Sequence, residues 1–172
     1  MTDYLELVLD EYEVNPYTIM LQPMIVEGKQ SSHVTEVESE FAARGKPIDI
    51  IKKSCEYFGS DYEGRRRGTR HLTGYTHKAP IEIEKSFSIF MFPTSSPERD
   101  DCIWISSSHI LRFSKNGPFE TNVLFRNKKH ICLPISFSVF ESQVARTAIL
   151  KSKLEQNVME TRRKYHYSEQ EA

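Results

Sequence analysis

The sequence predicts one α+β domain with a mostly antiparallel sheet, one inserted helix, a basic loop and a long C-terminal helix. Short apolar segments bounded by turn residues recur through the middle of the chain, as in sheets built from sequential strands. Helical spacing of apolar residues appears twice, briefly after residue 47 and at length after residue 137. The 172 residues are 38% hydrophobic and 27% charged, which is sufficient for one globular core.

The first elements are two apolar segments, residues 14–26 and 33–41, which residues 27–29 (Glu-Gly-Lys) separate. In the second segment the side chains alternate between two sides with the period of two that is typical of a strand. The pair predicts a hairpin with one exposed strand.

A helix is predicted next, because Pro47 stands where it would begin and Gly59 where it would end. Apolar side chains recur between them at helical spacing, namely Ile48, Ile51, Cys55 and Phe58. Residues 60–80 then hold four arginines and three glycines, Gly64, Gly68 and Gly74, and predict a loop or a frayed helix.

Three further segments rich in β-branched and aromatic residues predict strands: 81–93, 102–113 and 121–135. The last of these is predicted to be a hairpin that turns at residues 126–129.

The C-terminal helix is predicted from a capping box, Ser138 followed by Glu141, with Phe137 as the staple. Its apolar stripe has two halves that face different directions: Phe140, Val144 and Ala148, then Leu150, Leu154 and Val158. The second half is expected to pack within the protein, between protomers or against another protein. Residues 161–172 are expected to be a solvated tail, which leaves residues 1–160 as the folded domain.

Targeting features point to the cytoplasm. No apolar run approaches the roughly 20 residues that span a bilayer. The first six residues are acidic, unlike a signal or transit peptide. The three cysteines, Cys55, Cys102 and Cys132, are widely separated, which fits a reducing compartment.

Enzyme and metal-site motifs are missing from the sequence. It has no nucleophile elbow, no phosphate-binding glycine loop and no zinc-protease helix. Ser108 and His109 are adjacent, but neighbours on a strand point to opposite faces. His130 and Cys132 could share a strand face, yet no second ligand pair accompanies them. We therefore expect neither an enzyme nor a cofactor.

Charge is distributed unevenly along the chain, although the formal net charge is only −1. Residues 1–46 hold nine acids and three bases and sum to −6, whereas residues 64–80 hold five bases and no acid and sum to +5. The five bases are Arg65, Arg66, Arg67, Arg70 and Lys78. Guanidinium groups fork onto phosphate oxygens, and glycines beside them let the backbone approach a phosphate closely.

Several functions fit this basic segment. It could bind DNA or RNA, form a solvated loop, or contact acidic lipids, although no basic amphipathic helix with large apolar side chains accompanies it. Binding to RNA or to single strands would need exposed aromatic side chains on a sheet face, for which Tyr57, Tyr62 and Tyr75 are the candidates.

The order of several blocks resembles the competence transcription factor family, ComK, of Gram-positive bacteria. The blocks begin with Tyr12-Glu13-Val14-Asn15 and continue at residues 54–69, 77–81, 89–94, 104–106, 133–136 and 140–148. Together they span about residues 12–150.

The resemblance implies an activator of DNA-uptake genes that reads paired A-tract and T-tract half-sites through the minor groove as a dimer of dimers. Arg65, Arg66 and Arg67 would then enter or line the groove, since a narrow A-tract groove attracts arginine. The candidate phosphate clamps are Thr69, Arg70, His77 and Lys78, and further candidates at strand ends are Ser95, Ser96, Arg99 and His109.

The same resemblance implies four partners: A/T-rich promoter DNA, further copies of the chain in a dimer or tetramer, RNA polymerase and a proteolytic adaptor. No contact with a membrane is expected. Longer family members end in an aromatic-rich segment that closes with Pro. Here the nearest match is Tyr165-His166-Tyr167 without the Pro, which makes adaptor recognition through this tail doubtful.

Overall fold

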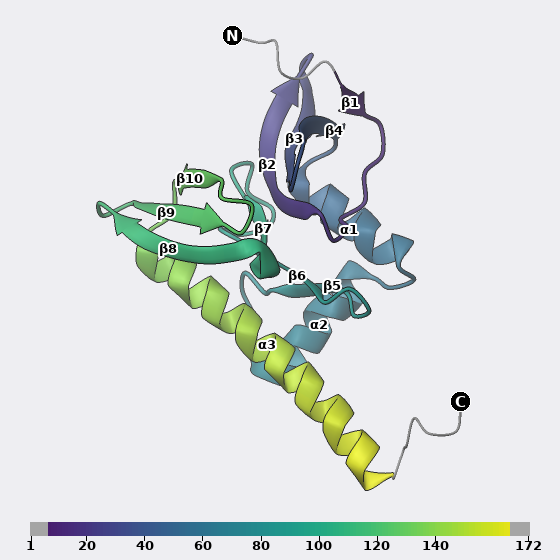
Figure 1. Ribbon diagram of the computed structural model, residues 1–172. Coiled ribbons are helices and arrows are strands. Elements are labelled where there is room, and N and C mark those ends of the chain that lie inside the picture. The colour runs from purple at the N-terminus through teal and green to yellow at the C-terminus, as the bar shows by residue number, and fades with distance from the viewer. Residues whose placement is uncertain (1–6, 166–172) are drawn as a thin grey trace.

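Two antiparallel-rich sheets and three α-helices make up the computed structural model, which describes residues 7–165 (Figure 1). Within those residues the larger sheet has the strand order β1-β4-β3-β2-β7-β6-β5. Its strands are β1 Val8–Leu9, β2 Thr18–Val26, β3 Lys29–Glu36, β4 Glu40–Arg44, β5 Ile81–Glu84, β6 Ile89–Pro93 and β7 Trp104–Ser106. All neighbouring pairs are antiparallel except β1 with β4.

The smaller sheet has the order β10-β9-β8 and follows β7 after a 3-10 turn at Ser107–His109. Its strands are β8 Ile110–Asn116, β9 Glu120–Phe125 and β10 His130–Leu133. The helices are α1 Pro47–Tyr57, α2 Tyr62–Thr73 and α3 Phe137–Lys164. The predicted fold class is therefore confirmed, as are the first helix and the hairpin of residues 121–135.

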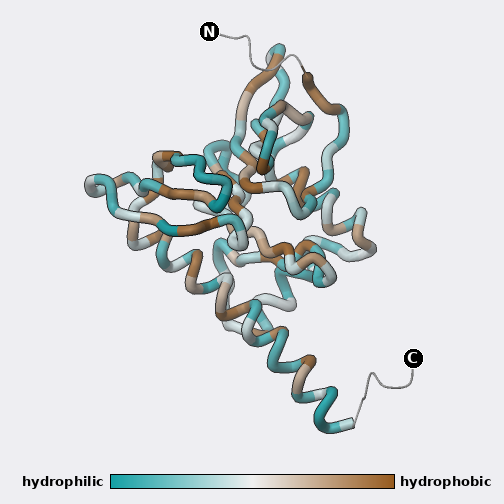
Figure 2. The backbone as a smooth tube through the Cα atoms, in the orientation of Figure 1, coloured by the Kyte–Doolittle hydropathy of each residue, from teal (hydrophilic) through white to brown (hydrophobic). Residues whose placement is uncertain are grey.

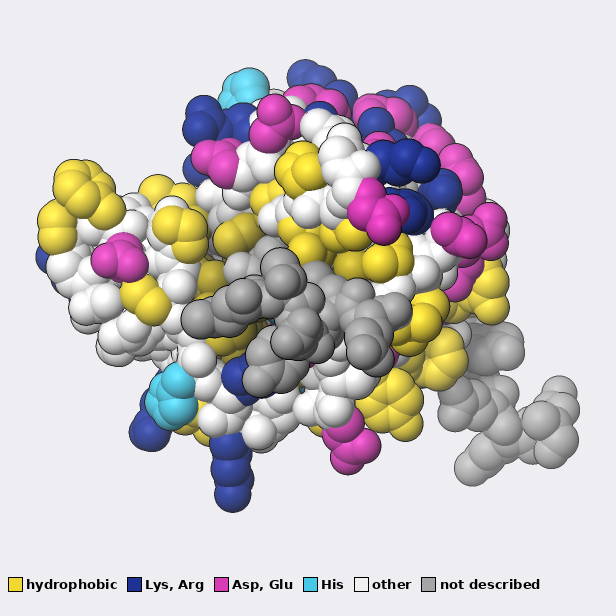
Figure 3. Space-filling model, turned by 90° about the horizontal axis from the view of Figure 1, so that it is seen from above, with side chains coloured by type: hydrophobic (Ala, Val, Ile, Leu, Met, Phe, Trp, Pro, Cys, Tyr) yellow, Lys and Arg dark blue, Asp and Glu magenta, His cyan; other side chains and the backbone are white. Residues whose placement is uncertain are grey.

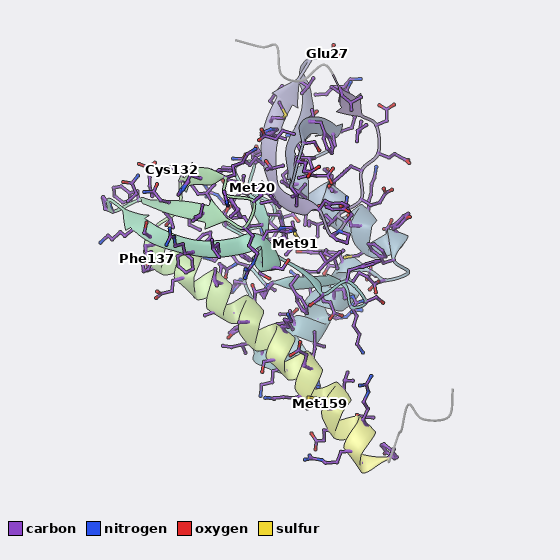
Figure 4. The ribbon with its side chains drawn as sticks, in the orientation of Figure 1. Met20, Glu27, Met91, Cys132, Phe137 and Met159 are labelled. Carbon is purple, nitrogen blue, oxygen red and sulfur yellow. The ribbon has the colours of Figure 1, made fainter. Side chains whose placement is uncertain are left out.

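The two faces of the larger sheet pack against different elements, because successive side chains of a strand alternate. Leu21, Met91 and Trp104 join one buried cluster with residues of α1 and α2. Their neighbours Met20, Phe92 and Ile105 join a second cluster with residues of β8–β10 and α3; Met20 and Met91 are labelled in Figure 4. The larger sheet thus separates α1 and α2 from the smaller sheet.

Of the two predicted alternatives for residues 60–80, a loop or a frayed helix, the loop is wrong for residues 62–73. These residues form the regular helix α2, so the sheet carries two inserted helices and not one. Two caps stabilise this helix: the Asp61 side chain accepts a hydrogen bond from the Gly64 amide at 3.0 Å, and Gly74 takes the left-handed conformation at φ 81°. Each cap offsets the cost of an internal glycine, which is about 1 kcal/mol relative to alanine.

Other predicted boundaries also change. Residues 33–41 belong to two strands, β3 and β4, because the chain turns between Glu36 and Glu40. Residues 81–93 form the hairpin β5–β6, and residues 102–113 are shared between β7, the 3-10 turn and the start of β8. In each case a short turn interrupts an apolar run that sequence periodicity treats as continuous.

The N-cap of helix α3 lies two residues before the predicted one. Ser136 is the N-cap and its hydroxyl accepts from the Val139 amide at 3.4 Å, so Ser138 caps nothing. Phe137 lies in the first turn and packs on Phe113 of β8, with ring centroids 5.6 Å apart. At about 1.5 Å per residue, the 28 residues of α3 span about 42 Å, from the smaller sheet to a far end near Met159 (Figure 4).

Residues 161–164 continue α3 as its last, fully exposed turn, so the expected tail starts as helix. Hydrophobic residues recur along α3 toward that end (Figure 2). Within residues 7–165, no helix combines the length and the apolar character needed to cross a bilayer.

Candidate nucleic-acid interface

Helix α2 sorts the predicted arginines onto two faces. Tyr62, Arg65 and Thr69 lie at i, i+3 and i+7 and turn toward the body of the protein. Arg66, Arg67 and Arg70 lie outside this inward-facing row, where they and His71 are exposed. We call these four residues the basic face. A helix spaces its guanidinium groups at fixed distances, which the predicted loop would not have done.

Arg65 forms an ion pair within the protein. Its Nη1 donates to Oε1 of Glu82 on β5 at 2.8 Å, and the Glu82 side chain is only 8% exposed. A carboxylate this deeply buried needs a cationic partner, because an unpaired buried charge is strongly destabilising. The structure therefore gives Arg65 a partner that a groove-inserted arginine would have to abandon.

Thr69 is also turned inward. It is 2% exposed, and its hydroxyl donates to the carbonyl of Pro80 at 2.8 Å. In this position the hydroxyl holds the chain that follows α2 and is not available to a phosphate oxygen.

Arg66 keeps only a weak internal partner. Its Nε lies 3.2 Å from Oε2 of Glu63, one turn earlier on α2, and both side chains are 52% exposed. Surface pairs of this kind contribute about 0–1 kcal/mol. A phosphate can therefore displace Glu63 at little cost.

A pocket of about 170 Å³ beside α2 brings together predicted residues from three segments. Arg66, His77, Lys78 and Ser96 line it, together with Tyr62 and the acids Glu63 and Glu98. Burial raises the pKa of the Tyr62 hydroxyl to about 12, so the pocket wall contributes a neutral phenol.

Three of the predicted strand-end residues are occupied elsewhere. Arg99 forks onto Asp101 with two hydrogen bonds of 2.9 Å, which neutralise it. Ser95 lies 3.4 Å from the same carboxylate. The His109 ring is 2.8 Å from the Pro16 carbonyl, on the side of the smaller sheet. The structure joins none of the three to the basic face.

The segment between α2 and β5, residues 75–80, carries His77 and Lys78, and we call it the strap. Its fixed position was not predicted, and neither were the two residues of α3 that contact it. Gln143, 1% exposed, donates from Nε2 to the Lys78 carbonyl at 2.9 Å and to the Pro93 carbonyl at 2.7 Å. Arg146 donates to the His77 carbonyl at 2.8 Å. The sequence offered one signal for this contact: Gln143 is a polar residue at a position of α3 that faces the core.

The three candidate tyrosines do not form a stacking platform. Tyr62 is buried edge-on to Trp104, Tyr75 lies under the Arg146 guanidinium at 4.5 Å, and only Tyr57 is largely exposed. These three belong to helices and to the strap, not to a sheet face. These three tyrosines therefore do not provide the exposed aromatic side chains on a sheet face that single-strand binding by a sheet requires.

Charge on the rest of the surface is mixed. On the face shown in Figure 3, Lys and Arg side chains stand among Asp and Glu, as expected of a chain with a net charge of −1. Among residues 7–165, no cluster of three or more potential metal ligands was found.

The three residues predicted to contact a partner, Leu150, Leu154 and Val158, differ in their exposure. Leu150 is 2% exposed and packs inside the protein. Leu154 and Val158 are half-buried and line a groove of about 420 Å³ between α3 and the β5–β6 hairpin. The buried Phe90 and Met159, which is 69% exposed, line the same groove.

A helix that presents several arginines to solvent is an arrangement typical of the class of proteins that bind polyanions such as nucleic acids. The family model described as ComK protein matches residues 9–159. The competence transcription factor of Bacillus subtilis (strain 168) is 42% identical over 150 residues, which cover 87% of this chain and 78% of that protein. The chain belongs to the ComK family. No solved structure matches it.

Proposed function

We propose that this protein activates transcription of competence genes by binding A/T-rich duplex DNA through the minor groove. Family membership and the relative's description as a competence transcription factor support the activator role. The observation that carries DNA binding is the basic face, three arginines on one side of α2 with only one weak acidic partner.

Arg66, Arg67 and Arg70 are the residues proposed to meet the groove and its phosphates, with His77 and Lys78 of the strap as flanking phosphate contacts. A-tracts narrow the minor groove and deepen its negative potential, which favours inserted arginine. Arg65 supports this surface from behind through Glu82.

The glycines of α2 fit the same proposal. A Cβ placed on Gly68 would meet no atom within 4 Å, so the fold itself does not require glycine there. An alanine would give a more stable helix at that position. A bare backbone beside the basic face lets a phosphate approach closely.

The test is a set of binding titrations of the full chain on two duplexes of equal length, one with paired A-tract and T-tract half-sites and one rich in G·C pairs. We expect tighter binding to the A-tract duplex by at least about 1,000-fold at physiological salt, the lower end of the usual ratio of specific to non-specific affinity. Equal affinity for the two duplexes would contradict minor-groove selectivity, and preference for a single strand would favour the RNA or single-strand alternative.

We also propose that the groove at Leu154 and Val158 is a contact surface between copies of this chain. Leu150, although predicted as part of it, lies in the core. The far half of α3 is supported on one side only, and isolated helices of about 12–15 residues are marginal in water. A second copy would cover Met159 and stabilise this half.

Replacing Val158 by Asp should lower the molar mass measured by light scattering toward that of one chain, because a charge in the contact is costly. The matched control is Gln156→Asp, an exposed position on the same helix. An unchanged mass for Val158→Asp would refute this surface as the self-contact.

A cytoplasmic location follows from the proposed function, as does contact with RNA polymerase, and both stay predictions. In the segment Tyr165-His166-Tyr167, the nearest match to the family's adaptor-binding tail, residues 166–167 lie outside the described residues.

A further inference from the structure

The strap is held from two sides. At its end Thr69 of α2 donates to the Pro80 carbonyl at 2.8 Å. In its middle, two residues of α3 bind consecutive carbonyls: Arg146 that of His77 at 2.8 Å and Gln143 that of Lys78 at 2.9 Å. We call Gln143 and Arg146 the clasp.

The backbone at Lys78 has a conformation that needs such support. Its φ is +50°, the left-handed region that a residue with a Cβ seldom adopts. Strained backbone of this kind costs about 1–3 kcal/mol and persists only where surrounding contacts fix it. The Gln143 amide, bound to the carbonyl of this same residue, is such a contact.

Gln143 is fixed in turn. It is 1% exposed, and its amide nitrogen also donates to the Pro93 carbonyl at the end of β6 at 2.7 Å. One buried NH₂ group therefore joins three elements: α3, β6 and the strap. Arg146 adds a second tether, since its guanidinium also lies 4.5 Å from the Tyr75 ring centroid.

These contacts are made to backbone carbonyls, so they leave the charged ends of the strap side chains unoccupied. His77 is exposed, Lys78 is half-buried, and both line the pocket that Arg66 also lines. The clasp thus decides where two basic side chains stand relative to the basic face without engaging them.

We infer that Gln143 and Arg146 are positioning residues of the DNA-contact surface: α3 holds the strap so that His77 and Lys78 are aligned with the arginines of α2. This inference rests on the proposed function. It adds that α3, whose far half carries the proposed self-contact, is physically joined to the surface that meets DNA.

The test is a double-mutant cycle on A-tract DNA. Gln143→Leu removes both amide hydrogen bonds at similar size. We expect it to weaken affinity about tenfold, the loss that one misplaced charged contact would cause. It should also lower the log–log salt slope by about one unit. In a chain that already carries His77→Ala and Lys78→Ala, the same substitution should weaken affinity no further.

Phe140→Leu is the control, because Phe140 lies one turn before Gln143 on the same helix, is buried in the other core cluster, and packs on Phe92 and Phe113 without a hydrogen bond to the strap. It destabilises α3 yet should leave affinity unchanged. Arg146→Ala provides a second clasp variant should Gln143→Leu fail to fold, and Arg146→Lys should restore part of the affinity.

Equal losses from Gln143→Leu with and without His77 and Lys78 would overturn the inference, as would an equal loss from Phe140→Leu. A wild-type chain that binds no duplex would overturn the proposed function itself. If the wild type binds the A-tract duplex and Gln143→Leu binds it equally well, only the inference about the clasp is refuted.

Discussion

Replacing Arg66, Arg67 and Arg70 together by alanine is expected to weaken binding to A-tract DNA by at least about 100-fold at physiological salt, while the fold is retained. Each substitution removes one phosphate or groove contact, and the log–log dependence of affinity on salt should flatten by nearly one unit per contact, about three in all. Titrations at several salt concentrations measure both effects.

The fold should survive because the three side chains are exposed, and of the three only Arg66 forms an ion pair, with the surface acid Glu63. The control removes the same charge elsewhere: Lys29, Lys153 and Arg163, all exposed and outside α2, are changed to alanine. If that control loses as much affinity, the effect is one of net charge and the basic face has no special role.

Arg65→Ala is expected to act on stability instead. It leaves the Glu82 carboxylate buried with no cation, and we expect the free energy of unfolding to fall by about 2–3 kcal/mol, less than for a fully buried pair because the Arg65 side chain is 31% exposed. Arg67→Ala, at an exposed site on the same helix, should change stability by less than about 0.5 kcal/mol.

Urea denaturation of the two variants measures the difference. The combined change Arg65→Ala with Glu82→Leu should recover much of the loss, since replacing both members of a buried pair by apolar groups is often neutral. If Arg65→Ala is as stable as the wild type and its DNA affinity is as low as that of Arg67→Ala, then Arg65 contacts the DNA groove and does not act mainly through the fold.

Some elements were predictable because local signals and packing agree. Helix α1 has Pro47 at its start and a left-handed Gly59 after its end, and its apolar residues all face one cluster. The hairpin of β9 and β10 has its turn where the charged residues interrupt two apolar runs.

Helix α2 was predicted only as a loop or a frayed helix, because its own composition argues against a regular helix. It has two internal glycines and one large buried side chain, Tyr62, so periodicity gives no stripe. Asp61 and Gly74, the two capping residues, were the readable signals. The clasp could not be predicted at all, because the sequence does not say which carbonyls a buried glutamine will reach across 65 residues.

The pairing of β2 with β7 places strands that are about 80 residues apart side by side at the centre of the larger sheet. The sequence predicted strands but not their order, and the order decides that the strap and α2 lie near the β5 edge. The sequence therefore predicted which types of residue form the site. Only the fold shows which of them face the protein interior and which face solvent.

The separation of α1 and α2 from the smaller sheet by the larger one has a further consequence. A duplex seated against α2 would leave the outer side of β8–β10 uncovered. Residues 102–140, which include that sheet, hold five lysines and arginines and a single acid, Glu120, and Phe119 at the β8–β9 turn is 77% exposed. In the proposed complex, a duplex on α2 and a second ligand on this basic side would therefore not compete for the same face.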